Sequence, residues 1–253
     1  MQQLNNFKEY LHERGLPFSC KNNDCIEFSL KVTDLSGKRV KFNLQAIQVR
    51  NKLKIRETDN RLPSFCPNRH INSDNSFCLG TDEDLMNITV KDFYQKITSF
   101  LKAQLQVEKF KCWPFDYSEW AHGDGAIYQK KVEENLMKID LKSIGISLNK
   151  LNLVEKKNKS FPDQKYLQLF HGSNLLVTYV DGIPHNKRNS CICTKYGKRK
   201  HITLKNCKRQ CAKILYNIAS NELKRIDAEA KFWERCKALN SKCCQTMSEC
   251  GLK

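Results

Sequence analysis

Strict alternation between apolar and polar residues near the start of the chain limits the folds that it can adopt. Residues 26–32 and 40–44 alternate without a break, and residues 53–55 repeat the pattern over a shorter span. Alternation with a period of two places every second side chain on the same face of a sheet. The link at residues 34–38, Asp-Leu-Ser-Gly-Lys, has the composition of a hairpin turn. The sequence therefore predicts an antiparallel meander with one buried face.

Helical patterns lie on both sides of the predicted meander. Apolar residues recur every three or four positions in residues 2–14 and 90–105, and a further helix is expected near residues 126–140. Thr89 and Asp92 stand at the start of the second pattern with the spacing of a capping box. The order helix, meander, long loop, helix, helix predicts an α+β domain in the first part of the chain.

The long loop, residues 60–88, has no periodicity and is rich in Pro, Asn, Asp, Ser and Gly. Loops of this length in compact domains are usually functional. It contains Cys78, with His70 eight residues upstream. A cysteine in a polar loop that follows a sheet is a candidate nucleophile, whose reactive form is the thiolate. The alternative is a buried structural cysteine between Phe77 and Leu79.

Residues 70–80, His-Ile-Asn-Ser-Asp-Asn-Ser-Phe-Cys-Leu-Gly, resemble the active-site segment of E2 ubiquitin-conjugating enzymes. In that family a His-Pro-Asn triplet, a short polar turn and an aliphatic residue precede the catalytic Cys-Leu. Aligned on Cys78, the triplet falls on Asn68-Arg69-His70, so His70 stands where the family has its oxyanion-stabilising asparagine. The strict triplet is absent, as in divergent bacterial E2-like proteins, which this chain resembles more closely.

Two further segments, Pro-Asn-Arg-His at residues 67–70 and Glu-Trp-Ala-His-Gly at residues 119–123, also resemble that bacterial branch. The resemblance covers roughly residues 20–140. It implies an E2 (UBC-like) fold, with an antiparallel meander flanked by helices and a small, cysteine-rich, partly helical module after it.

The resemblance implies acyl transfer as the activity. Cys78 would accept a ubiquitin-like protein from an E1-like enzyme as a thioester and pass it to an amine on a target protein. His70 and Asn72 are the candidate donors to the oxyanion; the alternatives are a loop-stabilising role for His70 and a turn-forming role for Asn72. Asp74 either orients the incoming amine or is an exposed turn residue. Bacterial relatives of this kind often act in antiphage defence.

Two other segments offer rival residues for the chemistry. Cys66 is the rival nucleophile, although its neighbours Phe65 and Pro67 favour packing where the third strand ends. Trp120 and His122 lie in a Gly-containing link, where packing is the default and an active-site role for His122 is the alternative.

The chain contains 13 cysteines, and the compartment of the protein determines whether they form disulfides or remain thiols. The first residues contain no basic stretch followed by an apolar segment, as an export signal would, and no apolar run reaches the ~20 residues of a membrane span. We therefore predict a soluble protein of the cytoplasm, without a membrane partner. In that reducing compartment cysteines serve as core residues, metal ligands or nucleophiles.

The character of the sequence changes near residue 150, which predicts two domains, residues 1–150 and 151–253. Residues 156–162 have the composition of a linker. Strands are expected near residues 167–170 and 175–179, and a helix near residues 206–239.

Two cysteine pairs in this second region form a C-x-C…C-x3-C pattern, with thirteen residues between the pairs: Cys191, Cys193, Cys207 and Cys211. Four thiolates at such spacing close a tetrahedral site for a structural Zn²⁺. The alternative is a set of buried thiols without a metal. Residues 197–200, between the pairs, resemble the basic knuckle of SEC-C-type zinc motifs, and His201 is a possible substitute ligand.

Four more cysteines stand near the C-terminus, Cys236, Cys243, Cys244 and Cys250. They either build a second metal site, complete the first one, or lie in a frayed tail.

The net charge of +17 is concentrated in the second region, where residues 151–253 hold 21 Lys and Arg against 8 Asp and Glu. This imbalance indicates an anionic partner, either nucleic acid or an acidic protein surface, or merely keeps a cysteine-rich module in solution. It also supports a second hypothesis, a non-enzymatic nucleic-acid-binding zinc protein with an inactive E2-like scaffold. The basic residues that motivate this hypothesis are Lys198, Arg199, Lys200, Lys208 and Arg209.

Overall fold

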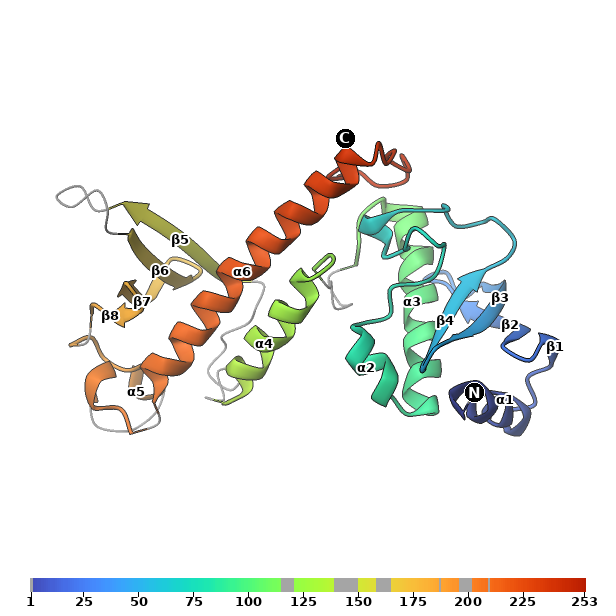
Figure 1. Ribbon diagram of the computed structural model, residues 1–253, viewed down its shortest axis with the longest axis horizontal. Helices are drawn as coiled ribbons and strands as arrows, with labels where there is room; N and C mark the ends of the chain where they lie inside the picture. Colours follow the sequence, from blue (N-terminus) through green and yellow to red (C-terminus); the bar gives the residue numbers. More distant parts are fainter. Residues whose placement is uncertain are drawn as a thin grey trace. The chain divides into compact units, whose positions relative to one another are not determined.

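The computed structural model of the chain (Figure 1) comprises two compact units. Unit 1 is Met1–Trp120 together with Trp233–Lys253, and unit 2 is Ala121–Phe232. The structure describes residues 2–114, 121–138, 150–157, 165–186, 188–195, 202–208 and 210–253.

Unit 1 contains the predicted antiparallel meander, with its strands paired in chain order. These strands are β1 (Phe18–Asn22), β2 (Cys25–Thr33), β3 (Arg39–Val49) and β4 (Lys52–Glu57). Phe28 pairs with Leu44 and Ala46 with Ile55, and all four side chains are buried. The alternating side chains thus form one apolar face, as the sequence pattern predicts. The edge strand β1 has no such alternation and is almost entirely exposed.

Three helices of unit 1 complete its core: α1 (Gln2–Glu13), α2 (Asp82–Asn87) and α3 (Val90–Phe110). Phe7 of α1 packs edge-on against Phe28 of β2, at 5.4 Å, and against Phe93 of α3, at 5.7 Å. The predicted cap of α3 is present, because the Thr89 hydroxyl accepts a hydrogen bond from the Asp92 N–H (3.1 Å). The first part of the chain is therefore α+β, with helices packed on one face of a meander.

Unit 2 contains a second antiparallel sheet, of which the sequence predicted only the two middle strands. Its strands are β5 (Leu151–Lys157), β6 (Lys165–His171), β7 (Asn174–Val180) and β8 (Ile183–Pro184). Lys156 and Lys157, expected in a linker, instead form the end of β5, where they are exposed. The residues expected to continue that linker, 158–162, lie outside the described part of the chain.

Helices α4 (Gly125–Lys138), α5 (Ile192–Lys195) and α6 (Cys211–Ala238) complete the described helices of unit 2, and α6 runs on into unit 1. The core of unit 2 joins Val132 of α4, Val177 of β7 and Leu215 of α6. Because α4 shares this core, the structure divides the chain after residue 120, whereas the sequence pattern suggested a division near residue 150.

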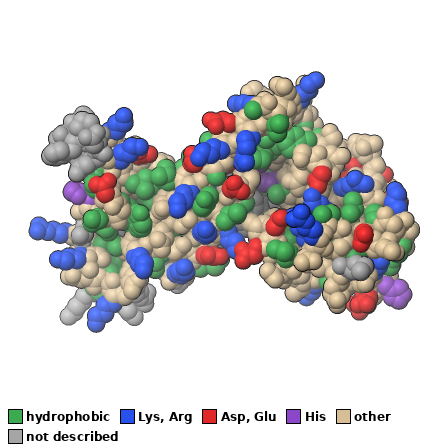
Figure 2. Space-filling model, in the orientation of Figure 1, with side chains coloured by type: hydrophobic (Ala, Val, Ile, Leu, Met, Phe, Trp, Pro, Cys, Tyr) green, Lys and Arg blue, Asp and Glu red, His purple; other side chains and the backbone are tan. Residues whose placement is uncertain are grey.

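None of the described helices combines the length and apolarity needed to cross a membrane. On the face drawn in Figure 2, the Lys and Arg side chains are spread over the surface with Asp and Glu side chains among them.

Candidate functional site

The Cys78 loop, residues 60–81, is fixed to the sheet by its main chain and by buried side chains. The Phe77 N–H donates a hydrogen bond to the Ile55 carbonyl of β4 (2.8 Å). Phe77 stacks on Phe100 of α3 with ring centroids 4.4 Å apart, and both Phe77 and Leu79 are buried. Cys78 between them is half-buried. Phe77 and Leu79, on either side of Cys78, therefore anchor this part of the loop in the core.

The tight turn before Cys78 uses the side chains of two predicted site residues. The Asn72 amide donates a hydrogen bond to the Ser76 hydroxyl (3.0 Å), and Asn72 itself is exposed. The Asp74 carboxylate pairs with Lys54 and accepts a hydrogen bond from the Ser76 N–H (3.1 Å). Burial opposes ionisation of Asp74, but these contacts outweigh it and hold its pKa at about 2. Both side chains therefore stabilise the turn, and their roles toward an acyl group stay predictions.

His70 reaches Cys78 through its main chain. It ends the short helix η1 (Pro67–Arg69) in the left-handed conformation, with φ of 53°. Its carbonyl oxygen accepts a hydrogen bond from the Cys78 N–H (2.7 Å). Its imidazole is buried and lies edge-on to Trp113, with centroids 4.6 Å apart. The main chain of His70 thus fixes the nucleophile candidate, while donation from its imidazole stays a prediction.

Several groups act in opposite directions on ionisation of the Cys78 thiol. Burial raises the pKa of Cys78, as does the Asp82 carboxylate, whereas the Gly80 N–H and the Lys96 ammonium group lower it. Lys96 Nζ lies 3.7 Å from the point where a Cβ on Gly80 would stand. Lys96 is therefore the cation of α3 that faces this segment. No sequence pattern singled it out, since its place beside Cys78 depends on how α3 packs.

Cys66, the rival nucleophile, is buried, with 1% of its surface exposed. Burial raises the pKa of its thiol well above the ordinary value. Its neighbour Arg69 is also buried and exchanges two hydrogen bonds with Gln104 of α3. Nε donates to the amide oxygen, and the amide nitrogen donates to the Arg69 carbonyl, both at 2.7 Å. Sequence analysis missed this pairing, which joins the loop to the helix behind it.

The structure brings together the four predicted metal ligands in unit 2. Cys191, Cys193, Cys207 and Cys211 hold their sulfur atoms within 4.8 Å of one another. Three of the S–S distances are 3.3, 3.4 and 3.6 Å. A tetrahedral metal ion with bonds of about 2.3 Å to sulfur separates its ligands by about 3.8 Å. The cluster thus has the size of a four-thiolate site.

Local structure explains how four residues from two segments meet. The Cys191 N–H donates to the Ile202 carbonyl (2.7 Å), which joins the two segments. Cys207 follows the short helix η3 (Leu204–Asn206), and Cys211 is the first residue of α6. Hydrogen bonding with the Cys211 thiol lowers the pKa of Cys191, so the cluster favours one thiolate before any metal binds.

The other predicted residues of the C-terminal region have different environments. Among the described residues, the cluster around Cys191 is the one group of three or more side chains suited to a metal. Cys243, Cys244 and Cys250 are half-buried in unit 1, where Cys236 is buried. His201 and residues 197–200 lie outside the described part of the chain, as does Arg209, while Lys208 is exposed.

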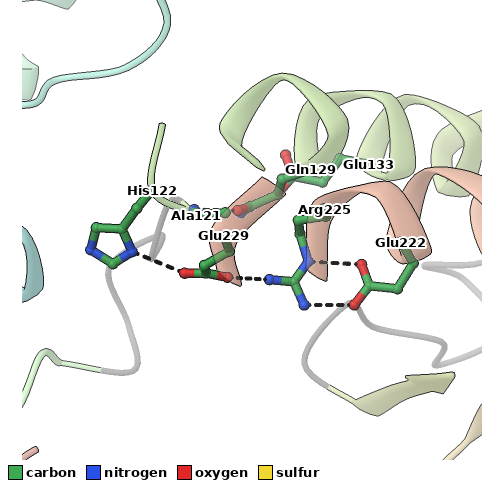
Figure 3. Close-up of polar contacts among 7 residues, drawn as sticks. All are labelled: Ala121, His122, Gln129, Glu133, Glu222, Arg225 and Glu229. Atoms are coloured by element: carbon green, nitrogen blue, oxygen red, sulfur yellow. Dashed lines mark hydrogen bonds and ion pairs between the residues drawn. The ribbon is translucent and has the colours of Figure 1, made fainter. Parts of the chain in front are cut away.

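His122 belongs to a row of charged side chains in unit 2 (Figure 3). Its Nδ1 lies 2.9 Å from Glu229, whose other oxygen accepts a hydrogen bond from Arg225 (2.8 Å). Arg225 also donates two hydrogen bonds to the buried carboxylate of Glu222, at 2.7 and 2.9 Å. These contacts link the segment just before α4 to α6, and the active-site alternative for His122 stays untested. Trp120, two positions before it in sequence, lies outside the described residues.

Replacing Arg225 with alanine is expected to destabilise unit 2 by about 3–5 kcal/mol, because a buried carboxylate loses its partner. Urea unfolding followed by circular dichroism measures the change. The matched control is Lys213→Ala, at an exposed position of the same helix, with an expected effect within about 0.5 kcal/mol. Adding Glu222→Gln to Arg225→Ala should restore part of the stability. Equal stabilities of Arg225→Ala and Lys213→Ala would contradict the role of this network.

Comparisons with known proteins cover nearly the whole chain. A family model described as a prokaryotic E2 domain matches residues 18–115, which include Cys78. A second model, described as a cysteine-rich domain C-terminal to the E2 domain, matches residues 121–252, which include all four clustered cysteines. No curated protein and no solved structure matches the chain. The second match spans more than half of the 253 residues. The chain therefore belongs to the prokaryotic E2 family in which a cysteine-rich domain follows the E2 domain.

Proposed function

We propose that the protein is an E2-like acyltransferase that carries a ubiquitin-like protein as a thioester on Cys78 and transfers it to an amine of a target protein. The observation that carries the proposal is the position of Cys78, a half-buried residue held between the buried side chains of Phe77 and Leu79 on an E2-family domain. A thiol at such a position is held in place by the core, and the carrier function requires that an acyl donor reaches its sulfur.

The chemistry consists of two acyl transfers. The Cys78 thiolate attacks the carbonyl carbon of an E1-bound thioester, and the E1 thiolate leaves when the tetrahedral oxyanion collapses. A target amine then attacks the Cys78 thioester, the Cys78 thiolate leaves, and the proton of the amine passes to solvent. The first exchange converts one thioester into another, so positioning and oxyanion stabilisation matter more than a strong base.

The loop supplies the groups that this chemistry requires. Donation from the Gly80 N–H and the charge of Lys96 both favour the thiolate of Cys78. We propose that Lys96 also stabilises the oxyanion, with His70, as a neutral or protonated imidazole, and Asn72 as the further candidate donors. Lys96 is half-buried, so its charge is only partly screened by water.

The partners that follow are an E1-like activating enzyme, a ubiquitin-like protein and a target protein. We further propose a cytoplasmic location, where reducing conditions keep Cys78 a thiol, and a role in bacterial antiphage conjugation, as in the relatives that the sequence resembles. The four-cysteine cluster of unit 2 is proposed to hold a structural Zn²⁺, since four thiolates in tetrahedral array favour that ion.

The test is reconstitution of loading. Full-length protein is incubated with the cognate E1-like enzyme, the ubiquitin-like protein and ATP, and is then run on gels with and without reductant. The expected result is a one-to-one adduct that reductant removes and that peptide mapping assigns to Cys78. An adduct at another cysteine would reject the assignment, and the absence of any adduct with an active E1-like enzyme would reject the carrier function.

Replacing Lys96 with methionine is expected to raise the pKa of Cys78 and slow its alkylation at neutral pH. A nearby cation in partly screened surroundings is worth on the order of 1 kcal/mol, or about fivefold in thiolate population. Alkylation of Cys78 by iodoacetamide, followed by peptide mass spectrometry across pH, measures the shift. The control, Lys102→Met, changes an exposed lysine of the same helix. Coincident pH profiles for Lys96→Met and the native protein would contradict the role of Lys96.

A further inference from the structure

The C-terminal segment, residues 239–253, packs against the end of α3 and against residues 66–69 of the Cys78 loop, all within unit 1. The Ser248 N–H and hydroxyl both donate to the Lys111 carbonyl, at 2.7 and 2.9 Å. Met247 is buried against Val107 of α3. Arg69 of the Cys78 loop donates a hydrogen bond to the Thr246 hydroxyl (3.3 Å). The end of the chain is therefore part of the core that supports this loop.

Two cysteines meet where the C-terminal segment touches the loop. The sulfur atoms of Cys66 and Cys244, which are 178 positions apart in the sequence, lie 2.6 Å from each other, and both residues are thiols in this structure. Cys66 is buried, whereas Cys244 is half-buried and open to a reagent. A covalent S–S bond is about 2.05 Å long, so a small movement of the two side chains joins them.

We propose that Cys66 and Cys244 form a reversible disulfide by exchange with a low-molecular-weight disulfide of the glutathione class. This bond would tie the C-terminal segment covalently to the Cys78 loop. The proposed acyl-transfer chemistry does not use these two thiols, so the disulfide can form whether or not Cys78 carries a thioester.

The exchange proceeds in two balanced steps. The Cys244 thiolate attacks one sulfur of the small disulfide, which gives a mixed disulfide on Cys244 and releases one small thiolate. The Cys66 thiolate then attacks the Cys244 sulfur and releases the second small thiolate. Two protein thiols are oxidised, one small disulfide is reduced to two thiols, and the two protons of the protein thiols pass to the released thiolates.

The surroundings of the pair favour this order of attack. Burial opposes ionisation of Cys244, but hydrogen bonding with Cys66 and Thr246 and the charge of Arg69 bring its pKa below the ordinary value. Burial raises the pKa of Cys66, which is shielded until a mixed disulfide forms beside it. The half-buried member of the pair, Cys244, therefore reacts first, and the buried member, Cys66, resolves the intermediate.

The experiment uses the full chain, reduced and then incubated with oxidised glutathione, blocked with iodoacetamide and digested with trypsin without reductant. The expected product joins peptide 62–69, which contains Cys66, to peptide 243–253, which contains Cys244. Reductant added before blocking should abolish this product. A bond between Cys243 and Cys250 falls within the second peptide and gives no cross-link.

Three variants decide the assignment. Cys66→Ser and Cys244→Ser should each lose the cross-linked peptide, and the matched control Cys243→Ser should retain it. Loss in Cys243→Ser with retention in Cys244→Ser would overturn the pairing. Glutathione that stays on Cys244 of the native chain without transfer to Cys66 would also overturn it. A lower metal content in Cys66→Ser than in the native chain would also overturn the pairing, because the two cysteines would then be metal ligands.

Discussion

Replacing Cys78 with alanine is expected to eliminate the reductant-sensitive adduct with the ubiquitin-like protein completely, because alanine offers no atom that can accept the acyl group. The loss should be all or none, unlike the graded effect of removing a donor near the oxyanion. Cys78 is half-buried, and its two neighbours hold the main chain, so the substitution removes one sulfur and leaves the loop folded. Gel analysis of the loading reaction without reductant measures the result.

Two variants complete the test of Cys78. Cys112→Ala removes an exposed cysteine of the same unit and should leave loading unchanged. Cys78→Ser should form an oxyester that resists reductant and is cleaved by hydroxylamine. An adduct that persists in Cys78→Ala and disappears in Cys112→Ala would transfer the carrier role to Cys112.

Removal of the Zn²⁺ that we propose for the four-cysteine cluster is expected to unfold unit 2. Cys191 and Cys211 are fully buried in its core, beside Leu215 and Ile218 of α6. Structural zinc contributes about 10–16 kcal/mol in zinc-finger peptides, as much as the whole stability of a typical domain, about 5–15 kcal/mol. Metal analysis should give one zinc ion per chain, and a strong chelator should remove the thermal transition of unit 2 from the circular dichroism signal.

Substitution of one clustered cysteine distinguishes metal ligation by the four thiols from their mere burial in the core. Cys207→Ser, at a half-buried ligand, should lower the zinc content and the melting temperature together, and Lys208→Ala, at the exposed next position, should change neither. A chain that purifies without metal and melts identically with and without chelator would show that the four thiols are only core residues.

The fold was predictable wherever burial of one face of a helix or strand produces a periodic pattern of apolar residues in the sequence. The alternation in β2 and β3 and the helical spacing in α3 each record one apolar face, and the structure confirms them. The edge strands show no such periodic pattern. Four of the five residues of β1 are exposed, and β5 ends in a charged run that resembles a linker. Edge strands of this kind are held by main-chain pairing, which their composition does not record.

The candidate site was predictable where its residues are close in sequence. The Cys78 loop and the cluster that begins at Cys191 both follow from local spacing. Lys96 beside Gly80, Arg69 on Gln104 and Cys66 against Cys244 depend instead on tertiary packing. None of these pairs falls within one helix turn or one hairpin, so no local pattern could indicate them.

The return of residues 239–253 to unit 1 has a consequence for how such a chain evolves. The cysteine-rich family model extends to residue 252, yet Met247 in its last stretch packs in one buried cluster with Val107 and Cys66 of the E2 domain. A recombination event that joined this E2 domain to a foreign tail would uncover Val107 and remove the Thr246 partner of Arg69. The two domains are therefore expected to be inherited as a matched pair and not as interchangeable modules.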